Sequence, residues 1–285
     1  MRYQFIEAHR EEYPVSVLCE ALEVSMSGYY DWRRRPMSQR AQADAQLADQ
    51  MRVIYQAKRK LYGSPRVHAQ LQEQGIKCAR KRVARLLREQ GLVVRRPCHR
   101  AITTQGDAAA RVASNCLNRE FTATRPNEKW TGDITAIWTY EGWLYVAVIL
   151  DLFSRRVVGW AMAATADETL VELAFRMALQ QRHPPAGLLH HTDRGCQYTS
   201  TAYQALLAEQ GVPVSMSRTG NCWDNAVTES FFGTLKGECV DLACFHRRAE
   251  ARQTVFEFVE CYYNRVRRHS SPGYTSPAAY EQMMC

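Results

Sequence analysis

Hydrophobic positions between residues 130 and 165 follow the two-residue period of β-strands. Residues 133–138, 143–151 and 156–161 are each rich in β-branched and aromatic side chains, and turn residues separate these runs. The turns are short, and a short turn joins only antiparallel neighbours. The pattern therefore predicts an antiparallel meander of three strands.

Downstream of the meander, helical stripes alternate with short apolar runs. Asp167 is placed to cap a helix, residues 188–192 form a fourth predicted strand, and a helix over about 200–210 precedes a fifth strand at 212–216. The helical crossover makes the fourth strand parallel to a meander strand. A last helix carries Glu229. This order is that of the ribonuclease-H-like α/β fold, so we expect a mixed five-stranded sheet with flanking helices.

The first hundred residues contain helical patterns only. Residues 1–40 are predicted to form two short helices around a tight turn, which resembles a helix-turn-helix. A long helix follows over about 41–60. Beyond it, one helix ends at Gly75 and a second runs over about 79–90, with an apolar stripe and several basic side chains. Helix, turn and basic helix is the arrangement that docks in the DNA major groove.

The remaining parts of the chain are a linker and a C-terminal helix. Small and polar residues after residue 101 indicate a linker with little structure. Near the C-terminus, a helix over about 248–268 has an apolar stripe, which we expect to pack on the core; the alternative is a subunit contact. The predicted parts are a helix-turn-helix-like region (1–40), a basic helix-turn-helix DNA-binding region (41–101), a linker (102–124), a ribonuclease-H-like catalytic core (125–240), and a C-terminal helix with a basic tail (241–285).

Positive charge is concentrated in the first third of the chain. Residues 1–105 contain 20 Lys and Arg against 10 Asp and Glu, whereas residues 106–285 contain 17 against 19. A basic region joined to a near-neutral one suggests that the first holds an anionic polymer on which the second acts. The alternative is a helical hairpin with a solvated basic face. The candidate DNA contacts are Arg80, Lys81, Arg82, Arg85, Arg88, Arg95 and Arg96.

No apolar run approaches the length of a membrane span. The longest, residues 143–150, is closed by Asp151 and fits a buried strand better. The N-terminal residues are soon interrupted by charged side chains and do not have the pattern of a secretory signal. We therefore expect a cytoplasmic protein.

Three acidic residues stand where a sheet of this kind brings side chains together. Asp133 opens the first predicted strand, Asp193 closes the fourth, and Glu229 lies on the last helix, with thirty-five residues between it and Asp193. If the two strands are neighbours, both aspartates meet at one edge of the sheet, and Glu229 reaches them from its helix. Lys236, two turns further along that helix, is a candidate phosphate contact.

The chemistry of three converging carboxylates indicates bound cations, because the carboxylates repel one another unless cations compensate them. Oxygen-only ligands select Mg²⁺, or Mn²⁺ in its place. Two such ions can activate an attacking oxygen and stabilise a leaving oxygen in a displacement at phosphorus.

Other titratable residues nearby have simpler explanations. Asp151 ends a strand and is expected in a turn or a salt bridge. Asp224 is placed to cap the helix that carries Glu229. For His190 and His191 we favour a packed or hydrogen-bonded role over contact with a metal.

Motifs around the three acids are similar to those of a known family. They are Trp130-Thr-Gly-Asp133-Ile-Thr, His191-Thr-Asp193-Arg-Gly-Cys-Gln-Tyr198, and Asp224-Asn225-Ala226 through Glu229-Ser-Phe-Phe-Gly-Thr-Leu-Lys236-Gly-Glu238. Segments 25–32, 62–66 and 262–278 match as well. Together they resemble the OrfB transposases of insertion-sequence family three, which are DDE recombinases with a retroviral-integrase-like core. Gly132 and Cys196 depart from the small polar residues expected at their positions.

This resemblance implies Mg²⁺-dependent cleavage at the ends of a transposon and transfer of a 3′-hydroxyl to a new phosphodiester. Asp133, Asp193 and Glu229 would be the catalytic and metal-binding residues. It also implies a homo-oligomer acting on DNA in the bacterial nucleoid, with an OrfA-type partner or fusion. Two alternatives remain open: a DNA-binding regulator with a decayed core, and a nuclease that does not join strands.

Overall fold

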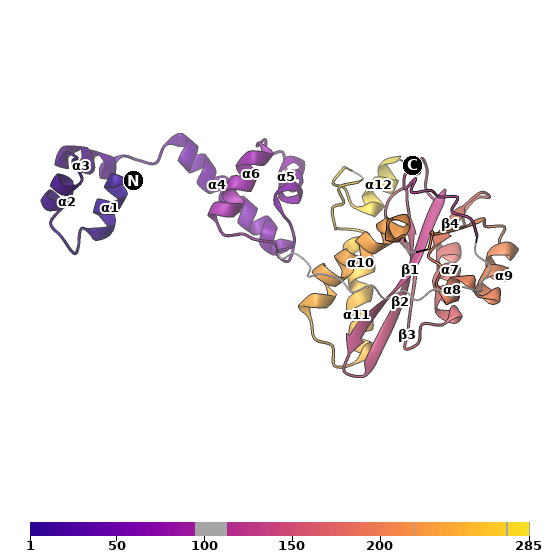
Figure 1. Ribbon diagram of the computed structural model, residues 1–285. Helices are drawn as coiled ribbons and strands as arrows, with labels where there is room; N and C mark the ends of the chain where they lie inside the picture. Colours follow the sequence, from indigo (N-terminus) through magenta and orange to yellow (C-terminus); the bar gives the residue numbers. More distant parts are fainter. Residues whose placement is uncertain (95–112, 220, 272, 285) are drawn as a thin grey trace. The chain divides into compact units, whose positions relative to one another are not determined.

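The computed structural model describes residues 1–94, 113–219, 221–271 and 273–284. The chain forms two compact units, residues 1–93 and 94–285 (Figure 1). Residues 102–112 of the predicted linker lie outside the described residues.

The first unit is entirely helical. Its first three helices are α1 (Arg2–His9), α2 (Val15–Ala21) and α3 (Met26–Arg34). They enclose a small cluster centred on Ile6 and Tyr29, both fully buried. Ser25 caps α3, because its hydroxyl accepts a hydrogen bond from the Gly28 amide at 3.1 Å.

A second group of helices in this unit has its own core. It consists of α4 (Gln39–Ala57), α5 (Ser64–Glu73) and α6 (Arg80–Glu89). Their apolar stripes meet around Met51, Leu71 and Val83. Gly75 and Gly91 adopt left-handed backbone conformations directly beyond α5 and α6, where a residue with a Cβ would be strained. The predicted helix, turn and basic helix is confirmed.

The second unit is built on one mixed sheet. Its strands are β1 (Lys129–Thr139), β2 (Gly142–Asp151), β3 (Val157–Ala163), β4 (Leu189–Thr192) and β5 (Val214–Met216), in the order β3-β2-β1-β4-β5. β1, β2 and β3 are antiparallel, whereas β4 is parallel to β1 and β5 is parallel to β4. The predicted ribonuclease-H-like α/β fold is confirmed.

β1 begins four residues before the predicted start. Lys129 and Trp130 pair with β4, and Trp130 also pairs with Asp151 of β2. These partners extend the strand in a stretch where the local pattern of side chains is weak. As a result, Asp133 lies within β1 rather than at its start.

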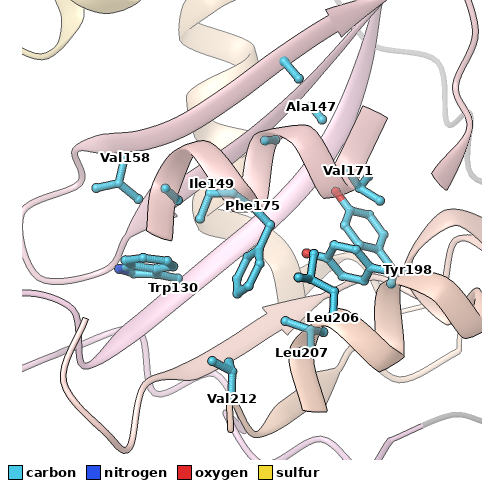
Figure 2. Close-up of a cluster of buried hydrophobic side chains, with 14 of the residues drawn as sticks. Trp130, Ala147, Ile149, Val158, Val171, Phe175, Tyr198, Leu206, Leu207 and Val212 are labelled. Carbon is cyan, nitrogen blue, oxygen red and sulfur yellow. The ribbon is translucent and has the colours of Figure 1, made fainter. Parts of the chain in front are cut away.

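One face of the sheet is covered by α7 (Glu168–Arg182), α8 (Cys196–Thr199) and α9 (Thr201–Glu209). Figure 2 shows this core, in which Phe175 of α7 lies beside Trp130 of β1. Asp167 caps α7 as predicted, accepting a hydrogen bond from the Leu170 amide at 3.1 Å. α7 packs so closely on β3 that a Cβ at Gly159 would overlap the α7 backbone.

The other face is covered by α10 (Ala226–Glu238), α11 (Arg248–Phe256) and the π-helical segment Glu257–Tyr263, with a 3-10 turn before α10 (Cys222–Asn225) and another after it (Val240–Leu242). Successive β2 side chains point to opposite faces of the sheet. Ala147 and Ile149 pack in the core on the α7 side, whereas Val146 and Val148 pack in the core on the α10 side. The predicted C-terminal stripe packs on this core. A further helix, α12 (Pro277–Met284), has no counterpart in the sequence pattern.

Among the described helices, none has both the length and the apolar character needed to cross a bilayer.

Candidate active site

Strand register brings Asp133 and Asp193 to matching positions. The last paired residues of the parallel strands β1 and β4 are Thr131 and His191. Each aspartate lies two residues beyond its member of that pair, and Asp193 is the first residue after β4. The fourth strand is parallel to a meander strand as predicted, and its neighbour is β1, so the two carboxylates lie at one edge of the β1–β4 pairing.

Backbone amides hold both carboxylates. Asp133 Oδ1 accepts a hydrogen bond from the Ile134 amide at 2.7 Å. Asp193 Oδ1 accepts one from the Gly195 amide at 2.9 Å, where the chain turns into α8. Each bond satisfies one oxygen of a half-buried carboxylate and restricts the orientation of the group.

A buried polar cluster fixes the start of α10 against β1. The hydroxyls of Thr131 and Thr228 donate to Asn225 Oδ1 at 2.8 and 2.9 Å, and they lie 2.9 Å from each other. Thr131 is two residues before Asp133, and Thr228 directly precedes Glu229. The cluster therefore places Glu229 beside the strand that carries Asp133.

The three acids interact electrostatically. Burial raises the pKa of the Asp133 carboxyl well above its ordinary value, and the charges of Asp193 and, less strongly, Glu229 raise it further. Burial also raises the pKa of Asp193, against the effect of the Gly195 amide. An anionic Asp133 is thus unfavourable unless a positive charge is close by.

The carboxylates of the three acids are ligands that suit a hard cation, although among the described residues they do not surround a common position. Within the described ranges, no three His, Cys, Asp or Glu side chains are placed to share a metal ion. Asp133, Asp193 and Glu229 offer only carboxylate oxygens, which Mg²⁺ and Mn²⁺ prefer, and a cation would relieve the unfavourable charge on Asp133.

The two histidines of β4 have packed, hydrogen-bonded roles. His190 Nε2 lies 2.8 Å from the Tyr203 hydroxyl, and the His191 ring nitrogens lie 2.9 and 3.2 Å from the hydroxyls of Ser215 and Ser217. Burial lowers the pKa of His190 to about 3 and that of His191 to about 4. Both rings are therefore neutral at pH 7.

Asp224 does not cap α10, and this prediction is wrong. Asp224 lies in the 3-10 turn before the helix, fully buried, and its carboxylate accepts hydrogen bonds from Arg218, Arg119 and Asn115 at 2.7 to 3.0 Å. The charged donors hold Asp224 more strongly than a helix terminus would. Long-range ion pairs thus position the segment that leads to Glu229.

Asp151 has the predicted role in a turn and a salt bridge. It accepts hydrogen bonds from the amides of Asn127 and Phe153 at 2.8 and 2.9 Å and lies 3.5 Å from Arg182. Burial raises its pKa to about 6. These partners account for Asp151 without a metal.

The candidate DNA contacts of α6 fall into two groups. Arg82 and Arg85 are half-buried, and each donates to the Asp44 carboxylate of α4 at 2.6 Å. Arg80, Lys81 and Arg88 are exposed. The first group therefore ties α6 to α4, whereas the second faces solvent. Arg95 and Arg96 lie outside the described residues.

Other sequence features are explained by packing. Lys236 is half-buried in the last turn of α10. Gly132 replaces an expected polar residue because a Cβ there would lie about 3 Å from Ile149 and His190. Sequence reasoning missed the roles of Thr131 and Thr228 in placing Glu229. The only available signal was the position of these residues inside the acidic motifs.

The chain matches three protein families. Residues 123–222 and 210–277 match two families described as integrase core domains, and residues 41–100 match an HTH-like domain. The chain is 41% identical over 283 residues to transposase InsF for insertion sequence IS3A of Escherichia coli (strain K12), covering 99% of this chain and 98% of that protein. It is 42% identical over 265 residues to an uncharacterized 31 kDa protein of insertion element IS600 from Shigella sonnei, covering 93% and 97%.

Solved structures are more distant. The catalytic core domain of HTLV-2 integrase in complex with magnesium, in its trimeric form, is 18% identical, with a TM-score of 0.44, over 56% of this chain and 99% of that one.

Proposed function

The chain belongs to the family of IS3 insertion-sequence transposases, and we propose that it cuts DNA at the ends of a mobile element and joins the freed 3′-hydroxyl to a target phosphodiester. Asp133, Asp193 and Glu229 are the catalytic, metal-holding residues in this proposal. The observation that carries it is the matching register of the two aspartates on β1 and β4, with Glu229 held beside β1.

The residues have distinct parts in the reaction. Asp133 and Asp193, each bonded to a backbone amide, form the fixed side of the site. Glu229 closes it from α10. Two Mg²⁺ ions, or Mn²⁺ in their place, would supply activation of the attacking oxygen and stabilisation of the leaving oxygen at phosphorus. Lys236, on the same helix as Glu229, would pair with a DNA phosphate.

DNA is the substrate that this chemistry requires, and the basic first unit is suited to hold it. Arg80, Lys81 and Arg88 are exposed on α6, where they can pair with phosphates. We extend the DNA-binding role to Arg82, Arg85, Arg95 and Arg96 and assign DNA binding to residues 41–101 and chemistry to residues 125–240. Assembly as a homo-oligomer at the nucleoid, with an OrfA-type partner or fusion, completes the proposal.

The test is a joining assay with a pre-cut DNA end bearing a free 3′-hydroxyl, in Mg²⁺ and in Mn²⁺. Glu229→Gln should reduce joining by about 100-fold or more, because an essential charge is lost while the shape is kept. Glu209→Gln, an exposed site on α9, is the matched control. DNA binding should persist in both variants.

Retained joining in Glu229→Gln would contradict the catalytic assignment. Hydrolysis of DNA by the parent protein without any joined product would instead favour the nuclease.

A further inference from the structure

Two buried polar groups beside the acid site have no hydrogen-bond partner among the described residues. They are the amide nitrogen Nδ2 of Asn225 and the hydroxyl of Tyr198. Asn225 is 5% exposed and Tyr198 is 1% exposed, so solvent does not readily supply the missing bonds. An unpaired buried donor lowers stability, so each such group calls for an explanation.

The orientation of the Asn225 amide is imposed by its neighbours. Its carbonyl oxygen Oδ1 receives the hydroxyls of Thr131 and Thr228, so its nitrogen must point away from both. A weak hydrogen-bonding interaction of the Asn225 side chain with the Asp133 carboxylate opposes the rise in the pKa of that group, although the amide nitrogen forms no hydrogen bond of ordinary geometry with the described residues. Thr131 and Asp133 are two residues apart on β1 and therefore share one face of the sheet.

Tyr198 approaches the same acids from the other side. It lies on α8, directly beyond the turn in which the Gly195 amide binds Asp193. Its ring packs against Tyr203, with 5.5 Å between centroids, in the core shown in Figure 2. Its hydroxyl is buried without a hydrogen-bond partner in the described part of the chain, five residues beyond Asp193, and the charges of Asp133 and Asp193 add to burial in raising its pKa.

We propose that Asn225 and Tyr198 are positioning residues of the acid site, whose donors hydrogen-bond to the carboxylate oxygens of Asp133 and Asp193 when these bind a cation. This inference rests on the proposed function. Carboxylates that bind a metal are commonly oriented by such outer hydrogen bonds. In the described structure neither donor forms a hydrogen bond of ordinary geometry.

The test is thermal unfolding of the full chain during a Mg²⁺ titration, which needs no assay of activity. Tyr198→Phe removes only the unpaired hydroxyl, so the cation-free melting temperature should be unchanged or higher. The Mg²⁺ concentration at half-maximal stabilisation should rise about 10-fold. Tyr203→Phe is the matched control: it loses the bond to His190, so it should melt lower and keep the parent midpoint.

Asn225→Ala provides an independent arm and should raise the Mg²⁺ midpoint by about 10-fold as well. If both Tyr198→Phe and Asn225→Ala keep the parent midpoint, the positioning role is overturned. Asp133→Asn separates this failure from that of the site itself. If Mg²⁺ stabilisation is lost in Asp133→Asn but not in the other two variants, the metal site is supported and only the positioning inference fails. If Asp133→Asn is still stabilised by Mg²⁺, both the metal site and the positioning inference fail.

Discussion

Glu281 of α12 forms a two-point ion pair with Arg182 at the end of α7. Both terminal nitrogens of Arg182 donate to the Glu281 carboxylate at 2.9 Å. Ser154 and Arg156, from the β2–β3 turn, donate to the same carboxylate at 2.8 Å. The C-terminal helix is thereby anchored to the sheet and to α7.

Replacing Glu281 should therefore destabilise the second unit strongly. Glu281→Ala leaves the largely buried Arg182 without its main partner, and the expected loss is about 3–5 kcal/mol of unfolding free energy. Urea unfolding measures it. Gln282→Ala, at an exposed neighbour on α12, is the control and should stay within about 0.5 kcal/mol of the parent. An equal loss in both variants would contradict the anchoring role.

The ion pairs of Asp224 predict a pH-dependent contribution to stability. Arg218 holds the pKa of Asp224 far below its ordinary value. A depressed acid pKa means that the stabilisation is present above about pH 4 and is lost as the pH falls below it. Asp224→Asn should cost about 1–3 kcal/mol at pH 7, since Arg218 and Arg119 remain half-exposed to solvent.

The loss in Asp224→Asn should shrink towards acid pH in urea unfolding experiments. Asp241→Asn, at an exposed site, is the control. A loss that is independent of pH would show that packing, rather than charge, holds Asp224.

The contribution of Asp133 to stability should change with pH in the direction opposite to that of Asp224. The raised pKa of Asp133 means that the cation-free protein loses stability as the pH rises through that pKa. Asp133→Asn removes the charge at constant shape and should increase the cation-free stability at pH 7. The gain should disappear at low pH, as followed by unfolding in EDTA. A destabilised variant at pH 7 would argue against repulsion among the acids.

His191 predicts a loss of stability at acid pH. Its pKa falls from 6.5 to about 4 through burial, so the unfolded chain binds a proton that the folded protein excludes. Unfolding free energy should therefore decrease between about pH 6.5 and 4, by up to about 3 kcal/mol for this residue. His191→Asn should flatten that decrease. His183→Asn is the control, because His183 is exposed and Asn tolerates its left-handed backbone conformation.

The two groups of basic residues on α6 should respond differently to substitution. Lys81→Ala and Arg88→Ala should weaken DNA binding and reduce the slope of log affinity against log salt by about 0.9 each, without loss of stability. Arg82→Ala should lower the melting temperature, because Asp44 loses a partner. Fluorescence anisotropy over a KCl series and thermal unfolding measure the two effects. Unchanged salt slopes in both exposed variants would sink the DNA-facing assignment.

Local sequence determined the elements and their order. The apolar residues of β2 specified a strand buried on both faces, and Asp167 specified the start of α7. Because a helical crossover imposes parallel strands, the sequence also predicted that the strand before Asp193 is parallel to a strand of the meander. These features depend on residues that are close in sequence, where spacing alone conveys the geometry.

Only the tertiary structure decided which polar groups meet. Asn225 and Thr131 are 94 residues apart, and Glu281 and Arg182 are 99 apart. No local period relates such pairs, so the local pattern wrongly predicts Asp224 as a cap and does not predict α12. A buried polar group forms hydrogen bonds with the partner that chain packing brings to it, because a buried group without a hydrogen bond costs free energy. The three acids can therefore be identified from the sequence, whereas the residues that orient them can be identified only from the folded structure.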